Sequence, residues 1–94
     1  MANYIIRIEI YDADYNQYET LHNKMKALGF FRQITFSNKK NYDLPSGTYF
    51  GKSGFSTSTI LSNVKQATKG LSSKDASIFL CQFTEWTASL YPSK

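Results

Sequence analysis

The sequence predicts an α+β fold of the ferredoxin-like βαββαβ class, a two-layer sandwich in which two helices cover one face of an antiparallel sheet. Two observations predict it. The periodic segments follow the order of a split βαβ unit, and each helix-like segment is followed by a glycine, Gly29 or Gly70. The 94 residues suffice for one modest core, so we expect a single domain over residues 1–94.

The first strand and the first helix have regular apolar spacings. A strand is predicted over residues 3–12, because apolar and polar side chains alternate there, and its core face consists of Tyr4, Ile6, Ile8 and Ile10. A helix is predicted over residues 14–28 with Asp12 or Asp14 as its cap. Its buried stripe, at spacings of three and four, consists of Tyr18, Leu21, Met25 and Leu28.

The middle of the chain predicts a hairpin. Residues 30–36 alternate as a second strand, residues 37–41 are typical of a turn, and residues 42–52 return as a third strand. Pro45 has no backbone N–H to donate to a neighbouring strand. It therefore marks either a kink within the third strand or a second turn.

The last third of the chain predicts a helix and a strand. Ser56 is a suitable cap for a helix over residues 56–69, whose buried stripe includes Ile60, Leu61, Val64 and Ala67. The predicted strand over residues 76–85 is apolar on both faces, which is typical of a central strand covered on each side. Since helices cover one face only, we expect a second copy of the chain to cover the other. The tail over residues 86–91 is a candidate fifth strand, pairing across such a dimer.

Composition excludes several classes of protein. No apolar run is long enough to span a membrane, and the charged first strand does not resemble a signal peptide, so a cytoplasmic location without membrane contact is expected. Cys81 is the single cysteine, which excludes an internal disulfide and a cysteine-rich zinc site.

The charge is unevenly distributed along the chain. The net charge is +4, and residues 20–74 contain nine bases and one acid, Asp43. This bias favours a polyanion as partner, although a small soluble domain commonly has a net charge of this size.

Three motif searches give no strong site. Gly51-Lys52-Ser53-Gly54 lacks the upstream glycine of a phosphate-binding loop. Cys81 lies among phenylalanines, as expected of a small buried residue rather than a nucleophile. Thr48–Lys52 does not match the aromatic signature of RNA-recognition motifs, which share this strand order.

Two kinds of residue could take part in chemistry. His22, the only histidine, borders the apolar stripe of the first helix, where it is either an ordinary helix residue or a proton carrier. Asp12 and Asp14 follow the first strand. They either cap the helix or hold Mg²⁺ and activate a hydroxyl.

The chain resembles the small GhoS family, the antitoxins of type V toxin–antitoxin systems. The resemblance lies in hydrophobic spacing, a Gly-Phe step and a Leu-Pro step, over residues 2–10, 14–22, 25–30, 32–35 and 42–45. It implies a ferredoxin-like fold and an endoribonuclease that cuts the toxin's messenger RNA without an assigned metal. It also implies an acid at the end of the first strand (Glu9 or Asp12) and a basic residue on the first helix (His22 or Lys24). Small CRISPR-associated integration subunits and VapD-type ribonucleases have a similar build, usually as dimers.

Two functions therefore remain open. In the first, the protein binds and cleaves RNA: Asp12 or His22 moves the proton of a 2′-hydroxyl, no cofactor takes part, and phosphates lie against Lys24, Lys26, Arg32, Lys39 and Lys40. In the second, it is a non-catalytic homodimeric module, a regulator or an adaptor, that meets a partner through the apolar face of the last strand and the Trp86 tail.

Overall fold

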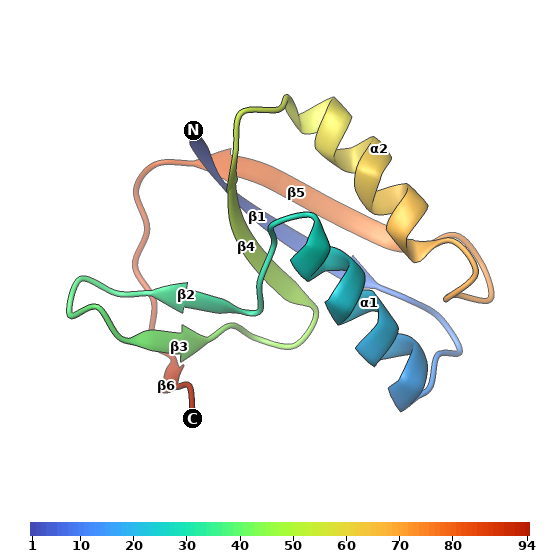
Figure 1. Cartoon of the computed structure of the whole chain (residues 1–94), viewed down its shortest axis with the longest axis horizontal. Coiled ribbons are helices and arrows are strands. Elements are labelled where there is room, and N and C mark those ends of the chain that lie inside the picture. The colour runs from blue at the N-terminus through green and yellow to red at the C-terminus, as the bar shows by residue number, and fades with distance from the viewer.

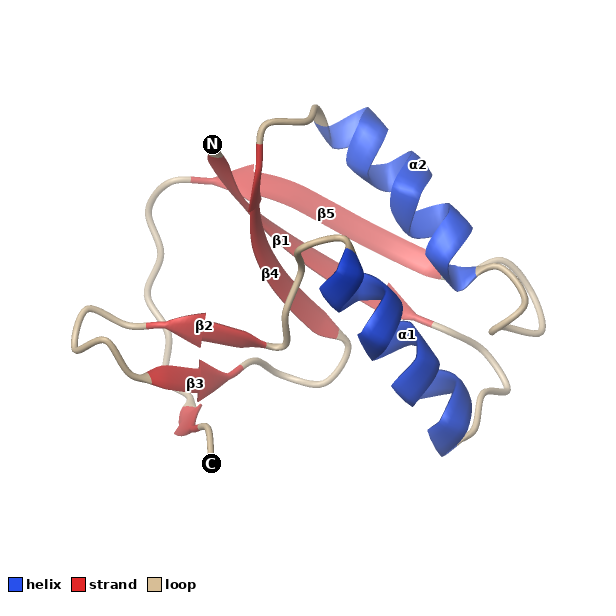
Figure 2. Cartoon of the chain, in the orientation of Figure 1, coloured by secondary structure: helices blue, strands red, loops and turns tan.

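The computed structural model describes all residues, 1–94, and contains two helices and two antiparallel three-stranded sheets. The first sheet has the order β4-β1-β5, formed by Thr48–Ser53, Ala2–Glu9 and Ser77–Phe83. The helices α1 (Tyr15–Ala27) and α2 (Thr57–Thr68) lie on one face of it (Figures 1 and 2). The second sheet has the order β2-β3-β6, formed by Gln33–Thr35, Asn41–Asp43 and Tyr91–Pro92, and extends to one side of the first.

Both helices begin where the sequence predicts. Asp14 caps α1, since its Oδ1 accepts the backbone N–H of Gln17 at 3.0 Å while the Gln17 side chain accepts the N–H of Asp14. Ser56 caps α2 by accepting the N–H of Thr59. These short-range hydrogen bonds satisfy backbone donors at the start of each helix, which is why the caps could be recognised from the sequence.

The predicted second and third strands are wrong in extent. Pro45 ends β3, and a turn follows it in which the Thr48 N–H donates to the Pro45 carbonyl at 3.0 Å. The alternative of a second turn is therefore the one observed. The segment over residues 30–36 contributes only an isolated pairing of Phe31 with Phe50 of β4, followed by the short strand β2. The hairpin β2–β3 thus leaves the first sheet and continues as part of the second.

The core lies between the helices and the first sheet. The apolar face of β1 is buried as predicted, with Ile6 fully inaccessible. The helices cover it with Leu21 and Met25 from α1 and with Ile60 and Val64 from α2. Burying such side chains contributes about 1.5–3 kcal/mol each.

The sequence predicted that the last strand is central in its sheet, and this prediction is wrong. Strand β5 is the edge of its sheet, paired with β1 alone, and β1 is central. Phe79 on the helix-free side is 69% exposed, and Cys81 is exposed too, so the prediction of a buried cysteine is also wrong. A single chain has only two helices, and both lie on the other face, so nothing within the chain covers these side chains.

A close backbone crossing joins the two sheets. Residues 29–32, which we call the crossing segment, run across β4, where the N–H groups of Phe31 and Phe50 each donate to the other's carbonyl at 2.8 and 2.7 Å. Gly51 lies beneath this segment. A Cβ there would overlap the Gly29 carbonyl oxygen and lie 2.5 Å from Cδ1 of Phe30. Only glycine allows the segment to pass so closely.

The tail returns to the hairpin of its own chain. Strand β6 pairs with β3, placing Tyr91 opposite Asp43, and the ring of Trp86 meets Phe36 edge-on at 5.4 Å between centroids. The prediction of a strand over residues 86–91 is wrong except at its last residue, and its pairing lies within one chain. Neither α1 nor α2 has the length and apolar character needed to cross a membrane.

Candidate functional site

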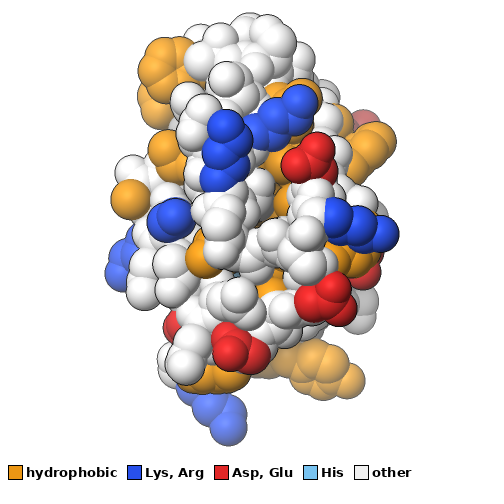
Figure 3. All heavy atoms as spheres, turned by 90° about the vertical axis from the view of Figure 1, so that its right-hand side faces the viewer, with side chains coloured by type: hydrophobic (Ala, Val, Ile, Leu, Met, Phe, Trp, Pro, Cys, Tyr) orange, Lys and Arg blue, Asp and Glu red, His pale blue; other side chains and the backbone are white.

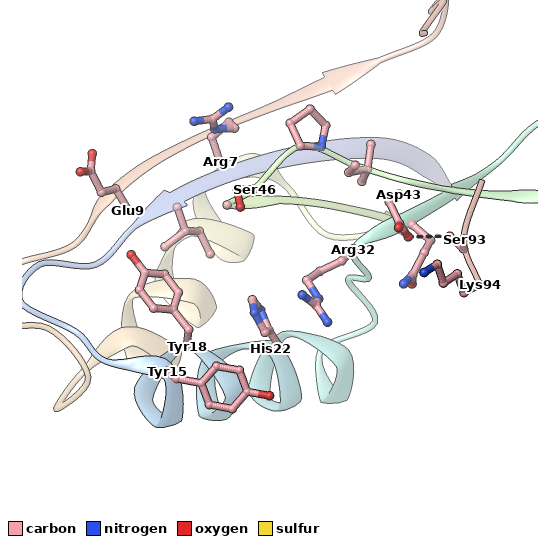
Figure 4. Close-up of a pocket in the computed structure, with 15 residues that line it drawn as sticks. Arg7, Glu9, Tyr15, Tyr18, His22, Arg32, Asp43, Ser46, Ser93 and Lys94 are labelled. Carbon is pink, nitrogen blue, oxygen red and sulfur yellow. Dashed lines mark hydrogen bonds between the residues drawn. The ribbon is translucent and has the colours of Figure 1, made fainter. Parts of the chain in front are cut away.

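A groove of about 860 Å³ lies between α1, the end of β1 and the loop that follows β3. Helix α1 contributes Tyr15, Tyr18 and His22 to one wall, and the crossing segment contributes Arg32 (Figure 4). The other walls and the rim consist of Arg7, Ile8, Glu9, Gln33, Asp43, Leu44, Pro45, Ser46, Gly47, Ser93 and Lys94. Segments far apart in the sequence therefore meet at one place.

His22 is anchored within this groove by a buried tyrosine. Its Nδ1 lies 2.7 Å from the hydroxyl of Tyr49, a residue of β4 that is 1% exposed. A phenol hydroxyl can donate or accept a hydrogen bond. The same contact therefore suits both neutral tautomers of the ring as well as the imidazolium, in which Nδ1 donates. The contact fixes one ring nitrogen and leaves Nε2 for a ligand.

Burial shifts the pKa values of both partners. Desolvation lowers the pKa of His22 below its ordinary 6.5, and the Arg32 guanidinium lowers it further, while Glu19 on the same helix opposes the shift. Desolvation raises the pKa of Tyr49 to about 12, against the opposing effect of Arg32. At neutral pH the pair therefore consists of a neutral imidazole and a protonated phenol.

Arg32 provides the positive charge nearest to this pair. Its backbone carbonyl accepts the N–H of Leu44 at 2.8 Å, which ties the crossing segment to the loop after β3. Its side chain points toward His22 in Figure 4. Of the two acids that line the groove, Asp43 already accepts the Ser93 hydroxyl at 2.6 Å. An anion that enters beside His22 would thus meet a guanidinium and a ring nitrogen.

The structure does not bring Asp12 to the groove. Asp12 lies in the β1–α1 loop with a positive φ of 52°, and its carboxylate accepts the Ser73 hydroxyl at 2.5 Å. Acidic and basic side chains are interspersed on the side of the molecule where this loop lies (Figure 3). Asp14 is the helix cap, and no group of three or more His, Cys, Asp or Glu side chains could hold a metal ion.

The other predicted phosphate contacts do not line the groove. Lys24 and Lys26 are exposed in the last turn of α1, and Lys39 and Lys40 are exposed in the turn between β2 and β3. Arg32, between these two pairs in the sequence, is the one that lines the groove. Of the predicted site residues, the structure brings together His22 and Arg32.

Sequence reasoning missed Tyr49, Arg7 and Lys94. Tyr49 pairs with Ile6 in the sheet and therefore faces the helices. The period of two along residues 48–50 would have placed one aromatic ring on that face, but not beside a histidine 27 residues away in the sequence. No local signal indicates Lys94, which reaches the groove only because β6 pairs with β3.

No protein-family model matches the chain, and no curated protein matches it. The geometry of the groove and the sequence patterns are therefore the basis for assigning a function.

The lowered pKa of His22 predicts acid destabilisation. In the unfolded chain the imidazole titrates near 6.5, whereas in the folded chain it titrates lower, so the unfolded state binds more protons between the two values. This contribution to stability is complete above pH 6.5 and is lost as the pH falls through the folded pKa. Urea unfolding of the wild type and of His22→Gln at several pH values would measure it. We expect a flatter profile for the variant, and parallel profiles would contradict the lowered pKa.

Proposed function

We propose that the protein binds RNA, with a phosphate held in the groove between Arg32 and His22. The observation that supports this most directly is the His22–Tyr49 contact of 2.7 Å beside the exposed guanidinium of Arg32. A guanidinium binds phosphate through paired N–H donors, and the neutral His22 tautomer with its proton on Nε2 can donate a further hydrogen bond. The lysines at the end of α1 and in the β2–β3 turn are exposed outside the groove and would meet phosphates farther along the RNA.

We propose further that the protein is an antitoxin-like endoribonuclease acting on a toxin's messenger RNA, as its resemblance to the GhoS family suggests. Neutral His22, with Nδ1–H donating to Tyr49, has a lone pair on Nε2 that can take the proton of a 2′-hydroxyl. The 2′-oxygen then attacks phosphorus, the bond to the 5′-oxygen breaks, and that oxygen takes a proton from water. The hydroxide left by that water takes the proton from the His22 imidazolium, which restores the neutral ring. Arg32 would stabilise the charge on the non-bridging oxygens. The products are a 2′,3′-cyclic phosphate and a 5′-hydroxyl, and no metal is required.

The fold we propose behind this function is ferredoxin-like. Adding the Phe31–Phe50 pairing to the first sheet extends its order to β5-β1-β4 followed by the crossing segment. This is the strand order of a split βαβ fold in which the second strand is reduced to one pairing. The two helices on one face support the same assignment.

RNA binding and cleavage are tested separately. Labelled single-stranded and hairpin RNAs, AU-rich and not, are incubated with the protein with and without Mg²⁺. We expect the logarithm of the binding constant to fall linearly with the logarithm of the salt concentration. We also expect cleavage that leaves cyclic phosphate ends both with and without Mg²⁺. His22→Gln should bind and not cleave.

Matched variants separate the groove from other surfaces. Lys65→Ala removes a positive charge from the last turn of α2, away from the groove, and should bind and cleave as the wild type does. Intact RNA with and without Mg²⁺ would refute the enzyme, and absence of binding would refute the whole proposal. Loss of cleavage in Asp12→Asn but not in His22→Gln would place the chemistry at the β1–α1 loop instead.

A further inference from the structure

Strand β5 presents an unpaired backbone edge. The N–H of Ile8 in β1 donates to Gly47, so the backbone groups of alternate β1 residues point toward β4 and those between them point toward β5. Arg7 and Ile5, which belong to the second set, pair with Phe79 and Cys81. The N–H and C=O groups of the β5 residues between these, Ile78, Leu80 and Gln82, therefore point away from the sheet.

This edge lacks the features with which proteins usually protect an edge strand. The seven residues Ser77–Phe83 contain no lysine, no other charge and no proline, and they pair with β1 in continuous register without a bulge. Helix α2 packs against β5, and Ile78 and Leu80, which face the helices, are partly buried against the core. An uncharged, apolar edge of this length is a template for another strand.

We propose that the occupant of this edge is a second copy of the chain, through antiparallel pairing of β5 with β5 centred on Leu80. Two copies of a strand pair about a two-fold axis. All seven residues of β5 find a partner only when Leu80, the central residue, lies opposite Leu80 of the second copy. In that register the outward backbone groups of Ile78 meet those of Gln82 of the second copy. No like charges face each other, because the strand has none.

The register makes a specific prediction for the helix-free face. Phe79 lies opposite Cys81 of the second copy, as a pair without hydrogen bonds whose Cα atoms are about 4.5 Å apart. The exposed ring of Phe79 would thus gain a neighbour that its own chain does not supply. The two copies of Cys81 lie diagonally, about 7–8 Å apart, which is too far for an easy disulfide.

Cysteine cross-linking tests the register. Phe79→Cys places a thiol opposite the natural Cys81 of the second copy, and mild oxidation should convert most of it to a covalent dimer on non-reducing gels. The wild type should cross-link several-fold less, and so should Phe79→Cys combined with Cys81→Ser. Ser77→Cys, on the same face but out of register with Cys81, is the matched control. Equal cross-linking of Phe79→Cys and Ser77→Cys would refute the register.

Oligomeric state tests the edge itself. Gln82→Pro deletes an outward N–H that no strand of the same chain uses, so the fold, followed by circular dichroism, should persist. Light scattering without RNA should show a dimer for the wild type and a monomer for Gln82→Pro. A monomeric wild type at high concentration would overturn the proposal. So would a dimer that survives Gln82→Pro, because the copies would then meet through another surface.

Discussion

Replacing Gly51 by alanine should lower the free energy of unfolding by about 3 kcal/mol, the upper end of the usual cost of overpacking and the largest stability effect that we expect from one added methyl group. The new Cβ would overlap the Gly29 carbonyl and press on the Phe30 ring, and backbone cannot move aside as a side-chain tip can. Relief would require the crossing segment to lift from β4, which would break the pairing of Phe31 with Phe50. Urea unfolding followed by circular dichroism measures the change.

Gly54→Ala is the matched control for this substitution. Nothing lies within 4 Å of a Cβ at Gly54, and its φ is not positive, so the variant should match or slightly exceed the wild type in stability. If Gly51→Ala were as stable as Gly54→Ala, the crossing segment would not lie over β4 as described. The placement of Arg32 in the groove would then lose its structural basis.

Arg32→Ala should weaken RNA binding about tenfold or more, because a charge-assisted hydrogen bond to phosphate contributes about 1.5–3 kcal/mol. It should also reduce the slope of log affinity against log salt by about 0.7 for a single strand, as one phosphate contact is lost. Fluorescence anisotropy with a labelled RNA over a series of salt concentrations measures both quantities.

Two variants make the result for Arg32 specific. Arg32→Lys keeps the charge but not the paired N–H donors, and should bind with intermediate affinity. Lys65→Ala removes one charge from α2 and should change affinity far less. If Arg32→Ala and Lys65→Ala weakened binding equally, general attraction to a basic protein would explain it, and the groove would not be the binding site.

The helices are the part of the fold that the sequence predicts best. The caps Asp14 and Ser56 depend on neighbours within a few residues, and so do the apolar stripes of α1 and α2, so their spacing predicts them. Leu28 is the exception, because it lies at the end of α1 and is exposed. The alternation that buries Ile6 and Ile8 in β1 is equally local. The hairpin was harder to predict from the sequence. Whether the chain forms a kink or a turn at Pro45 depends on which strands are available to pair with it.

The candidate site was predicted only in part. His22 and Arg32 were singled out by type and position, but Asp12 was grouped with them although the structure ties it to Ser73. The chain leaves β1 through the residue with a positive φ, which directs that carboxylate to the α2–β5 loop. Tyr49 lies in the predicted third strand, whose Thr48–Lys52 segment does not match the aromatic signature of RNA-recognition motifs, so no motif marked it as a site residue.

Local spacing predicts the order of the main helices and strands, the helix caps and the buried faces of β1, α1 and α2, because these depend on neighbours three or four residues away in a helix and two in a strand. Contacts between distant segments place β5 at an edge, put the hairpin in a second sheet, and bring His22 to Tyr49 beside Arg32. The last two of these depend on the close passage of residues 29–32 over Gly51, a contact between distant parts of the chain. No local spacing encodes such a contact, since it exists only when β4 and the segment after α1 are both in place.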